Sequence, residues 1–453
     1  MINHSSLILN KKTSLIFILL FTTIIVFDSS IVSFSTYSGV ELPISINVMI
    51  FVSFSIIFVI CSTMLLNSVR KIVSKYAYKP TPRVLRYFQY IITSTLIVTC
   101  ALILVIILQM LLLNSYSISL LRAQTYLTHF SALVFLSSLV FLFGRWFTSK
   151  RNYIILMYVT SFFISSINLV VSFLYLESYL FSSSLPYANV FPVEAYVANF
   201  GALPFPESLS PAFDAFSLSS FLLMWVAATI SLSQYRYKMG TIKYYSLTCI
   251  PLLYYVFPFQ NYFQDALFSL IESSPIFYSV LYIRSFSATK QVGALLFSLS
   301  FWTASSLVYD NRVRQSLLIS SIGMAILFGS LAITPLQYRV LPPYGLITEA
   351  FIPVGSYLLF VGIFTSAKHI SRDSELRKEF YKSAASQLTL LKAIGVSQME
   401  KELEKKTKLL EKRFGLSEKA EDYLQEHLEE ENAKQILHDV LNELYYSKSK
   451  KKL

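Results

Sequence analysis

The stretch YFQYIITSTLIVTCALILVIILQMLLL, residues 87–113, contains no charged side chain. It directly follows SVRKIVSKYAYKPTPRVLR, residues 68–86, which carry six Lys and Arg residues. A helix of about 20 apolar residues crosses the roughly 30 Å hydrocarbon core of a bilayer. Short loops rich in Lys and Arg stay on the cytoplasmic side. Residues 87–113 are therefore predicted to span a membrane, with residues 68–86 in the cytoplasm.

The composition of the whole chain is that of a membrane protein. Of its 453 residues, 54% are hydrophobic and 14% are charged, and the mean hydropathy is +0.55. Soluble domains carry about 25% charged residues. This balance excludes an ordinary cytosolic enzyme, a disordered chain and a secreted disulfide scaffold. Cys61, Cys100 and Cys249 lie in apolar runs and lack the spacing of metal-binding motifs.

Further apolar runs of similar length predict an all-α fold, a polytopic transmembrane helix bundle of about ten spans. The spans are predicted at residues 14–34, 45–67, 87–113, 124–147, 153–176, 215–234, 243–260, 289–308, 315–336 and 345–367. Lys11 and Lys12 before the first run would also suit a signal peptide. No small-residue cleavage pattern follows them, which favours a first span.

Positive charge predicts the orientation of this bundle. Residues 1–367 hold 20 Lys and Arg against 10 Asp and Glu. Residues 152–235 contain no Lys or Arg, so the aromatic loop 177–214 within them is predicted to lie outside. With the basic loops inside, the protein is predicted to be a multi-pass protein of the cell membrane with both termini in the cytoplasm.

A further apolar run within residues 258–284 is less regular. It contains Asp265 and Glu272, and a helix is expected to break at Ser273-Ser274-Pro275. An eleventh crossing there would move every later basic loop, and the C-terminal tail, to the outside. A re-entrant or interfacial segment instead keeps all of them in the cytoplasm.

After residue 367 the apolar pattern gives way to a charged one. Residues 368–453 hold 18 Lys and Arg against 16 Asp and Glu. Val396, Leu403 and Leu410 recur every seven residues, but charged residues occupy the facing positions, which predicts only a short coiled coil. The predicted domains are thus a transmembrane domain, 1–367, and a cytoplasmic helical tail, 368–453. The tail suits a protein partner or self-association, and a solubilising end is the alternative.

No sequence motif indicates an enzyme. The chain lacks phosphate-binding, dinucleotide-binding, zinc-protease and nucleophile-elbow motifs. Its basic excess lies on an apolar body, which indicates membrane loops rather than a nucleic-acid surface. The sequence therefore predicts the lipid bilayer as a partner, and it predicts no enzymatic activity, no cofactor, no metal site and no nucleic acid.

Ionisable residues within the predicted spans are the remaining functional signal, because a charge buried in lipid is costly. The candidate ligand-binding or ion-binding residues are Asp28 late in the first span, Asp265 and Glu272 in the irregular segment, and Glu349 one turn into the last span. Each position also suits a structural carboxylate at the membrane interface.

Glu349 is expected to face the bundle, because lipid exposure would cost its ionised form a few kcal/mol. Tyr338 and Arg339 are its proposed partners, as polar neighbours in the sequence. His129, near the start of the fourth span, is interpreted as an interface residue.

Glycine is scarce, with 12 residues in the chain. Gly323 and Gly329 lie six residues apart, which is not the GxxxG spacing of closely packed membrane helices. Close glycine-mediated helix crossings of the GxxxG type are therefore expected to be rare.

The last span and the start of the tail carry a resemblance. Residues 341–347 read LPPYGLI, residues 371–378 read SRDSELRK and residues 394–400 read IGVSQME. This stretch resembles the C-terminal part of a group of polytopic membrane proteins of ammonia-oxidising archaea, in which a PPxG-led last span runs into a charged helix with an IGxxQME-like segment. The resemblance covers residues 341–400. It implies membrane placement and no particular activity.

Two functions fit these observations. A membrane sensor or scaffold is favoured, in which the outer loop 177–214 or segment 258–284 receives a signal and the last span passes it to the tail. Residues 362–388 lack proline, so the span can continue directly into the tail helix. A transporter or channel for a small ion or amine is the alternative, suggested by the broken helix at Ser273-Ser274-Pro275.

The topology is directly testable by cysteine accessibility labelling at Ser183 and Ser447. We expect a cysteine at position 183 to react from outside and one at position 447 only from the cytoplasm. Labelling of both from one side would refute the assignment.

Overall fold

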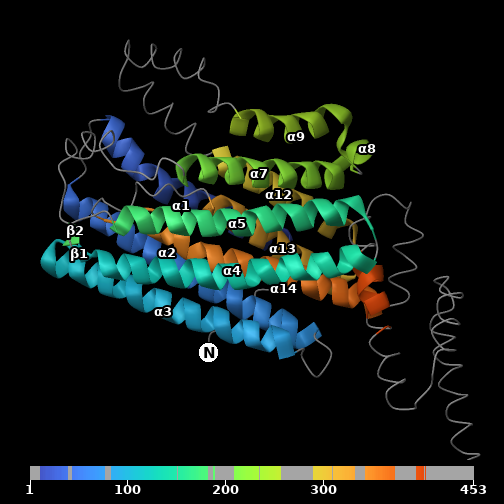
Figure 1. Cartoon of the computed structure of the whole chain (residues 1–453), viewed down its shortest axis with the longest axis horizontal. Coiled ribbons are helices and arrows are strands. Elements are labelled where there is room, and N and C mark those ends of the chain that lie inside the picture. The colour runs from blue at the N-terminus through green and yellow to red at the C-terminus, as the bar shows by residue number, and fades with distance from the viewer. Residues whose placement is uncertain are drawn as a thin grey trace, which may run out of the picture. The chain divides into compact units, whose positions relative to one another are not determined.

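A computed structural model describes residues 11–38, 43–76, 83–149, 151–181, 187–188, 209–233, 235–256, 289–308, 310–331, 342–372, 394–401 and 404. Contacts divide the chain into two units, Met1–Gln398 and Met399–Leu453. The described part of the first unit is a bundle of long helices with one small sheet (Figure 1). Segment 258–284, much of loop 177–214 and most of the tail lie outside the described residues.

The helices are α1 (Lys11–Ser38), α2 (Ile44–Tyr76), α3 (Arg83–Leu113), α4 (Ile118–Ser149), α5 (Tyr153–Phe181), α7 (Leu209–Ser233), α8 (Arg236–Met239), α9 (Thr241–Val256), α12 (Thr289–Leu307), α13 (Asn311–Ser330) and α14 (Leu346–Arg372). Strands β1 (Tyr116–Ser117) and β2 (Tyr187–Ala188) pair antiparallel, with Tyr116 opposite Ala188. Each of the ten predicted spans overlaps one of these helices.

Seven of the described helices are long and apolar enough to cross a membrane, namely α2, α3, α4, α5, α7, α13 and α14. This confirms a multi-pass helical membrane bundle. Helices α1, α9 and α12 overlap the other three predicted spans without belonging to this group, and α9 has only 16 residues. The number of ten spans stays a prediction.

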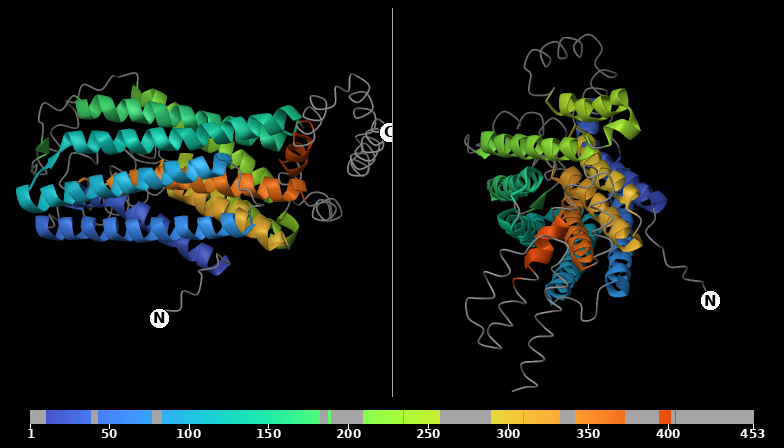
Figure 2. Two further views of the ribbon diagram at one scale, coloured as in Figure 1. Left: turned by 90° about the horizontal axis from the view of Figure 1, so that it is seen from below. Right: turned by 90° about the vertical axis from the view of Figure 1, so that its right-hand side faces the viewer.

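Helices α13 and α14 are the most enclosed of these seven. In their most apolar stretches, 94% of the α13 residues and all of the α14 residues are buried by protein, against 28% in α3. In Figure 2, the yellow and orange helices of this part of the chain lie between the green and the blue ones. By contrast, α3 exposes Leu104, Leu108 and Leu112, as expected for a helix that faces lipid.

The close approach of α13 and α14 depends on glycines from both helices. A Cβ atom on Gly323 of α13 would lie 2.5 Å from Leu359 N, and one on Gly355 of α14 would lie 2.7 Å from Leu327 N. A Cβ atom on Gly362 of α14 would likewise overlap Ser320 of α13. Any side chain at these positions would therefore force the two backbones apart.

The expectation concerned crossings of the GxxxG type, and this crossing uses glycines without that motif in either helix. Its glycines are divided between two helices, so a search for GxxxG within one span does not find them. Gly355 and Gly362 lie seven residues apart, which places both on the same face of α14 after two turns.

Basic residues gather at the junctions that close one end of the bundle. They lie where α2 meets α3, α4 meets α5, α7 meets α8, and α12 meets α13, and near the end of α14: Arg70, Lys71, Arg83, Arg86, Arg145, Arg151, Arg236, Arg312, Arg314 and Lys368. Successive long helices reverse direction at these junctions (Figure 1). That this end faces the cytoplasm stays a prediction.

The beginning of the predicted tail packs on the membrane bundle. Residues 394–401 are helical, and the first four of them are buried. Trp146 Nε1 in α4 donates a hydrogen bond of 3.1 Å to Gln398 Oε1, and a Cβ atom on Gly395 would overlap Ile370 of α14. By contacts, the first unit therefore extends to Gln398, beyond the change in composition at residue 368.

A Gly323→Ala variant should lose about 1–3 kcal/mol of stability, because the added methyl group meets the backbone of α14. Gly144→Ala in α4 is the matched control, since a Cβ atom there meets nothing within 4 Å. Removing a glycine from a helix interior should itself stabilise by about 0.5–1 kcal/mol. Unfolding of both purified variants in the same detergent measures the difference, and equal stabilities would contradict the close crossing.

Candidate functional site

Glu349 of α14 is fully buried, and side chains from one turn of α4 donate hydrogen bonds to it. Thr128 Oγ1 donates to Glu349 Oε1 at 2.8 Å, and Thr125 Oγ1 donates to Glu349 Oε2 at 3.4 Å. His129 Nδ1 lies 3.0 Å from Glu349 Oε1. The three α4 residues are spaced i, i+3 and i+4, so they share the helix face that meets α14. These four residues are the Glu349 cluster.

The position of a hydrogen atom on His129 follows from its neighbours. Nδ1 lies 3.0 Å from Thr125 O and 3.0 Å from Glu349 Oε1. A backbone carbonyl oxygen only accepts hydrogen bonds, so Nδ1 must carry the hydrogen and donate it. His129 therefore presents a donor to the carboxylate.

This arrangement surrounds a buried carboxyl group with hydrogen-bond donors. Thr128 Oγ1, Thr125 Oγ1 and His129 Nδ1 all approach the Glu349 oxygens, and a carboxylate can accept hydrogen bonds from all of them. A buried carboxylate needs such donors, because a charge without polar partners inside the bundle is costly.

Asp28 of α1 is also fully buried, and it caps the first turn of α14. Its Oδ2 accepts hydrogen bonds from Thr348 N at 2.9 Å and from Thr348 Oγ1 at 2.7 Å. A helix start leaves N–H groups unpaired, and the side chain of the N-cap residue usually accepts them. Here that position is Gly345, which has no side chain and a φ of 91°. Asp28 replaces the missing cap, and its negative charge is favourable at a helix N-terminus.

Tyr344 strengthens the same corner from outside the helix. Its hydroxyl donates to Asn47 O at 3.1 Å and to Asn47 Oδ1 at 3.2 Å, which ties the start of α14 to α2. Burial first, and then the nearby charge of Asp28, raise the pKa of Tyr344. The hydroxyl therefore stays protonated and keeps its role as a donor.

The structure thus brings two of the four candidate residues to neighbouring positions of α14. Asp28 binds Thr348, while Glu349 faces the bundle, as expected, and binds α4. Asp265 and Glu272 lie outside the described residues.

Sequence proximity did not give the partners of these residues. His129 is 4% exposed and packs inside the bundle, and its place at the membrane interface stays a prediction. The partners of Glu349 named above come from α4, whereas Tyr338 and Arg339, proposed from their proximity in the sequence, lie outside the described residues.

Sequence reasoning missed Thr125 and Thr128. A pattern in the sequence does mark them, because Gln124, Thr125, Thr128 and His129 place four polar side chains at helical spacing inside an apolar span. One of these side chains also reaches α3, because Gln124 Nε2 of α4 donates a hydrogen bond of 3.3 Å to Thr99 Oγ1 of α3.

Other charged groups in the described part of the chain form no comparable site. Within it, no group of three or more His, Cys, Asp or Glu residues is placed to hold a metal ion. Arg122 and Glu177 approach to 3.9 Å, with a quarter or more of each side chain exposed. Such a partly exposed pair contributes about 0–1 kcal/mol.

A double-mutant cycle tests whether His129 and Glu349 act as a pair. His129→Leu and Glu349→Leu should each cost about 3–5 kcal/mol of stability, because each leaves a buried partner uncompensated. The double variant should cost clearly less than the sum of the two. Arg122→Ala is the control and should cost about 1 kcal/mol or less. Strictly additive losses in unfolding experiments would show that the two residues are independent.

No family model, curated protein or solved structure matches this chain. The described residues form a multi-pass helical membrane bundle, in which the enclosed helix α14 holds the buried Glu349 cluster.

Proposed function

We propose that this protein is a membrane sensor or scaffold in which α14 couples the Glu349 cluster to the cytoplasmic tail. One observation carries the proposal: the same two helices, α4 and α14, form both the cluster and the contact with the start of the tail. Thr128 and Glu349 meet at one end, and Trp146 and Ile370 meet residues 394–398 at the other.

The length and burial of these helices suit such coupling. At 1.5 Å per residue, the cluster and the tail contact lie roughly 30 Å apart along either helix. Because α14 is enclosed by packed protein, a displacement at one end cannot be absorbed by lipid. A change in spacing between α4 and α14 at the cluster therefore alters the surface against which Gly395 and Gln398 pack.

Pro353 gives the cluster freedom to move. It lies within α14, four residues after Glu349, and has no N–H to donate to the Glu349 carbonyl. The turn that bears Glu349 is therefore joined less tightly to the rest of α14 than an unbroken helix would be.

The remaining features of the proposal concern placement and partners. The basic junctions at the tail end support a cytoplasmic location for that end and for both termini. The tail is proposed to bind a protein partner or a second tail through its heptad positions. The resemblance to membrane proteins of ammonia-oxidising archaea spans residues 341–400, which include both Glu349 and the docked segment. No enzymatic step is part of this function.

Fluorescence of Trp146 tests the coupling, because its indole N–H contacts the tail directly. The chain has three tryptophans, and Trp225→Phe with Trp302→Phe leaves Trp146 alone. In this background Gln398→Ala defines the emission without the Trp146–Gln398 hydrogen bond. Glu349→Gln, which keeps the shape of the side chain, should shift the emission toward that reference.

Glu177→Gln is the control for this experiment, since it removes the α5 carboxylate from the partly exposed pair that Glu177 forms with Arg122 of α4. We expect it to leave the Trp146 emission unchanged. If Glu349→Gln also leaves the emission unchanged while the Gln398→Ala reference shifts, α14 does not couple the two ends.

A transporter or channel for a small ion or amine is the second candidate. It is favoured by the oxygen atoms of Glu349, Thr125 and Thr128, which converge inside a membrane bundle. Flux into liposomes separates the two functions. Transport that is lost in Glu349→Gln supports this second candidate, whereas coupling without flux supports the sensor.

A further inference from the structure

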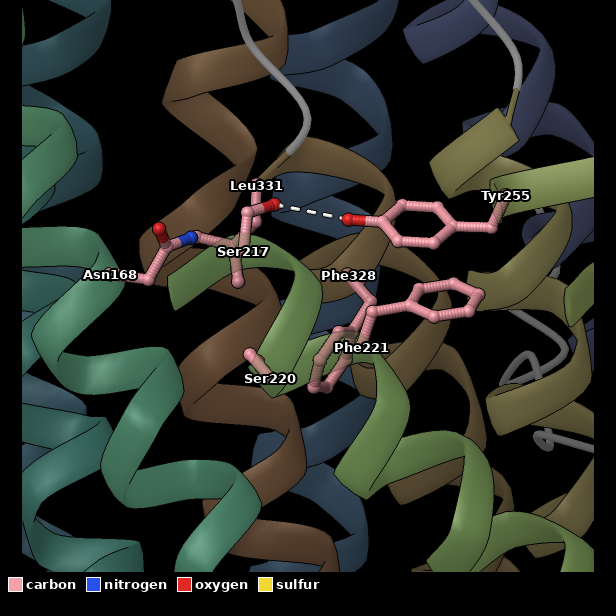
Figure 3. Close-up of a pocket in the computed structure, with 7 residues that line it drawn as sticks. All are labelled: Asn168, Ser217, Ser220, Phe221, Tyr255, Phe328 and Leu331. Carbon is pink, nitrogen blue, oxygen red and sulfur yellow. Dashed lines mark hydrogen bonds between the residues drawn. The ribbon is translucent and has the colours of Figure 1, made fainter. Parts of the chain in front are cut away.

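A small cavity lies where α5, α7 and α9 meet the end of α13. Its volume is about 20 Å³, and it is lined by Asn168, Ser217, Ser220, Phe221, Tyr255, Phe328 and Leu331 (Figure 3). A cavity holds a water molecule from roughly 10–15 Å³ upward on this measure. The space is therefore large enough for one water molecule.

Asn168 is the polar group that this cavity leaves without a protein partner. The residue is 3% exposed, and its Oδ1 makes no hydrogen bond within the described part of the chain. Figure 3 shows its amide nitrogen directed toward Ser217. A buried polar group without a hydrogen bond costs about 1–3 kcal/mol, which a bound molecule would relieve.

The opposite wall supplies the hydroxyl groups of Ser217 and Tyr255. Ser217 Oγ and Tyr255 OH lie 3.3 Å apart, a long hydrogen bond in which either atom can be the donor. Ser217 Oγ can donate one hydrogen bond and accept two, so it can bind a further molecule while it keeps this contact.

The chemistry of the lining selects a neutral guest. No charged side chain is among the seven lining residues, so an ion would lose its hydration without compensation. An amide presents a donor and an acceptor side by side, and whichever way it is turned both require partners. A molecule that both donates and accepts hydrogen bonds satisfies it, and water is the smallest such molecule.

We propose that this cavity is a binding site for one water molecule, which bridges Asn168 of α5 to the Ser217–Tyr255 pair of α7 and α9. The bridge would extend an existing polar contact between α5 and α7, in which Ser165 Oγ and Ser220 Oγ lie 2.6 Å apart. No residue of the Glu349 cluster lines this site, so the inference does not depend on the proposed function.

The test is a structure of the full chain in lipid nanodiscs, at a resolution that shows ordered water. We expect one peak within hydrogen-bond distance of the Asn168 amide and of Ser217 Oγ or Tyr255 OH. In Asn168→Leu, which keeps the size of the side chain but not its polar atoms, the peak should disappear. Ser166→Ala is the matched control, since its hydroxyl bonds to Phe162 O on the same helix and does not line the cavity.

Hydroxyl-radical footprinting is the second measurement, and it remains informative if Asn168→Leu does not fold, because Ser217→Ala can take its place. Radicals formed from a bound water should oxidise Tyr255 faster than the equally enclosed Tyr158, and the excess should fall in either variant. An empty cavity in the parent protein, a peak that persists in Asn168→Leu, or equal oxidation of the two tyrosines would overturn the proposal.

Discussion

Helix α14 is surrounded by protein along its whole apolar length, and this enclosure determines what its polar groups do. A helix in contact with lipid can send a carboxylate toward the nearby interface, but an enclosed helix must find hydrogen-bond donors among its neighbours. Glu349 finds them on α4, and the N–H groups of the first turn find an acceptor in Asp28 of α1. The glycines that bring α13 within backbone contact belong to the same enclosure.

These contacts give α14 two different kinds of attachment. At Gly355 and Gly362 it is fixed by close packing, which leaves little room for sliding or rotation. At its first turn it is held by hydrogen bonds that join it to α1 and α4, and each set is accepted by a buried carboxyl group. The bundle is therefore fixed by close packing along its centre and by polar contacts at one end.

Much of this architecture is local in origin, and so the sequence predicts it. An apolar run of about 20 residues satisfies its own backbone as a helix, and each of the ten predicted spans overlaps a helix for that reason. The exclusion of Glu349 from lipid follows equally from the cost of burying a charge. The predicted positions agree because they require no knowledge of which helix lies beside which.

Which residues bind the candidate side chains depends on which helices lie side by side, and the sequence does not show this. Glu349 and Thr128 are 221 residues apart, and Asp28 and Thr348 are 320 residues apart. For Glu349, sequence proximity suggested Tyr338 and Arg339, whereas the contacts described come from another helix. The α13–α14 crossing was not predicted for the same reason, since its glycines form a pattern only when the two helices lie side by side.

The cap formed by Asp28 and Thr348 links the first described helix to the last helix of the bundle, and so it bears on biogenesis. At about 5–20 residues per second, synthesis of the intervening chain takes on the order of tens of seconds. Until α14 has been made, Asp28 of α1 lacks the hydrogen bonds that Thr348 donates to it. The first turn of α14 likewise lacks its acceptor until it packs beside Asp28. Their meeting marks completion of the bundle, and a chain truncated before α14 would present an unsatisfied acidic residue to the factors that remove misassembled membrane proteins.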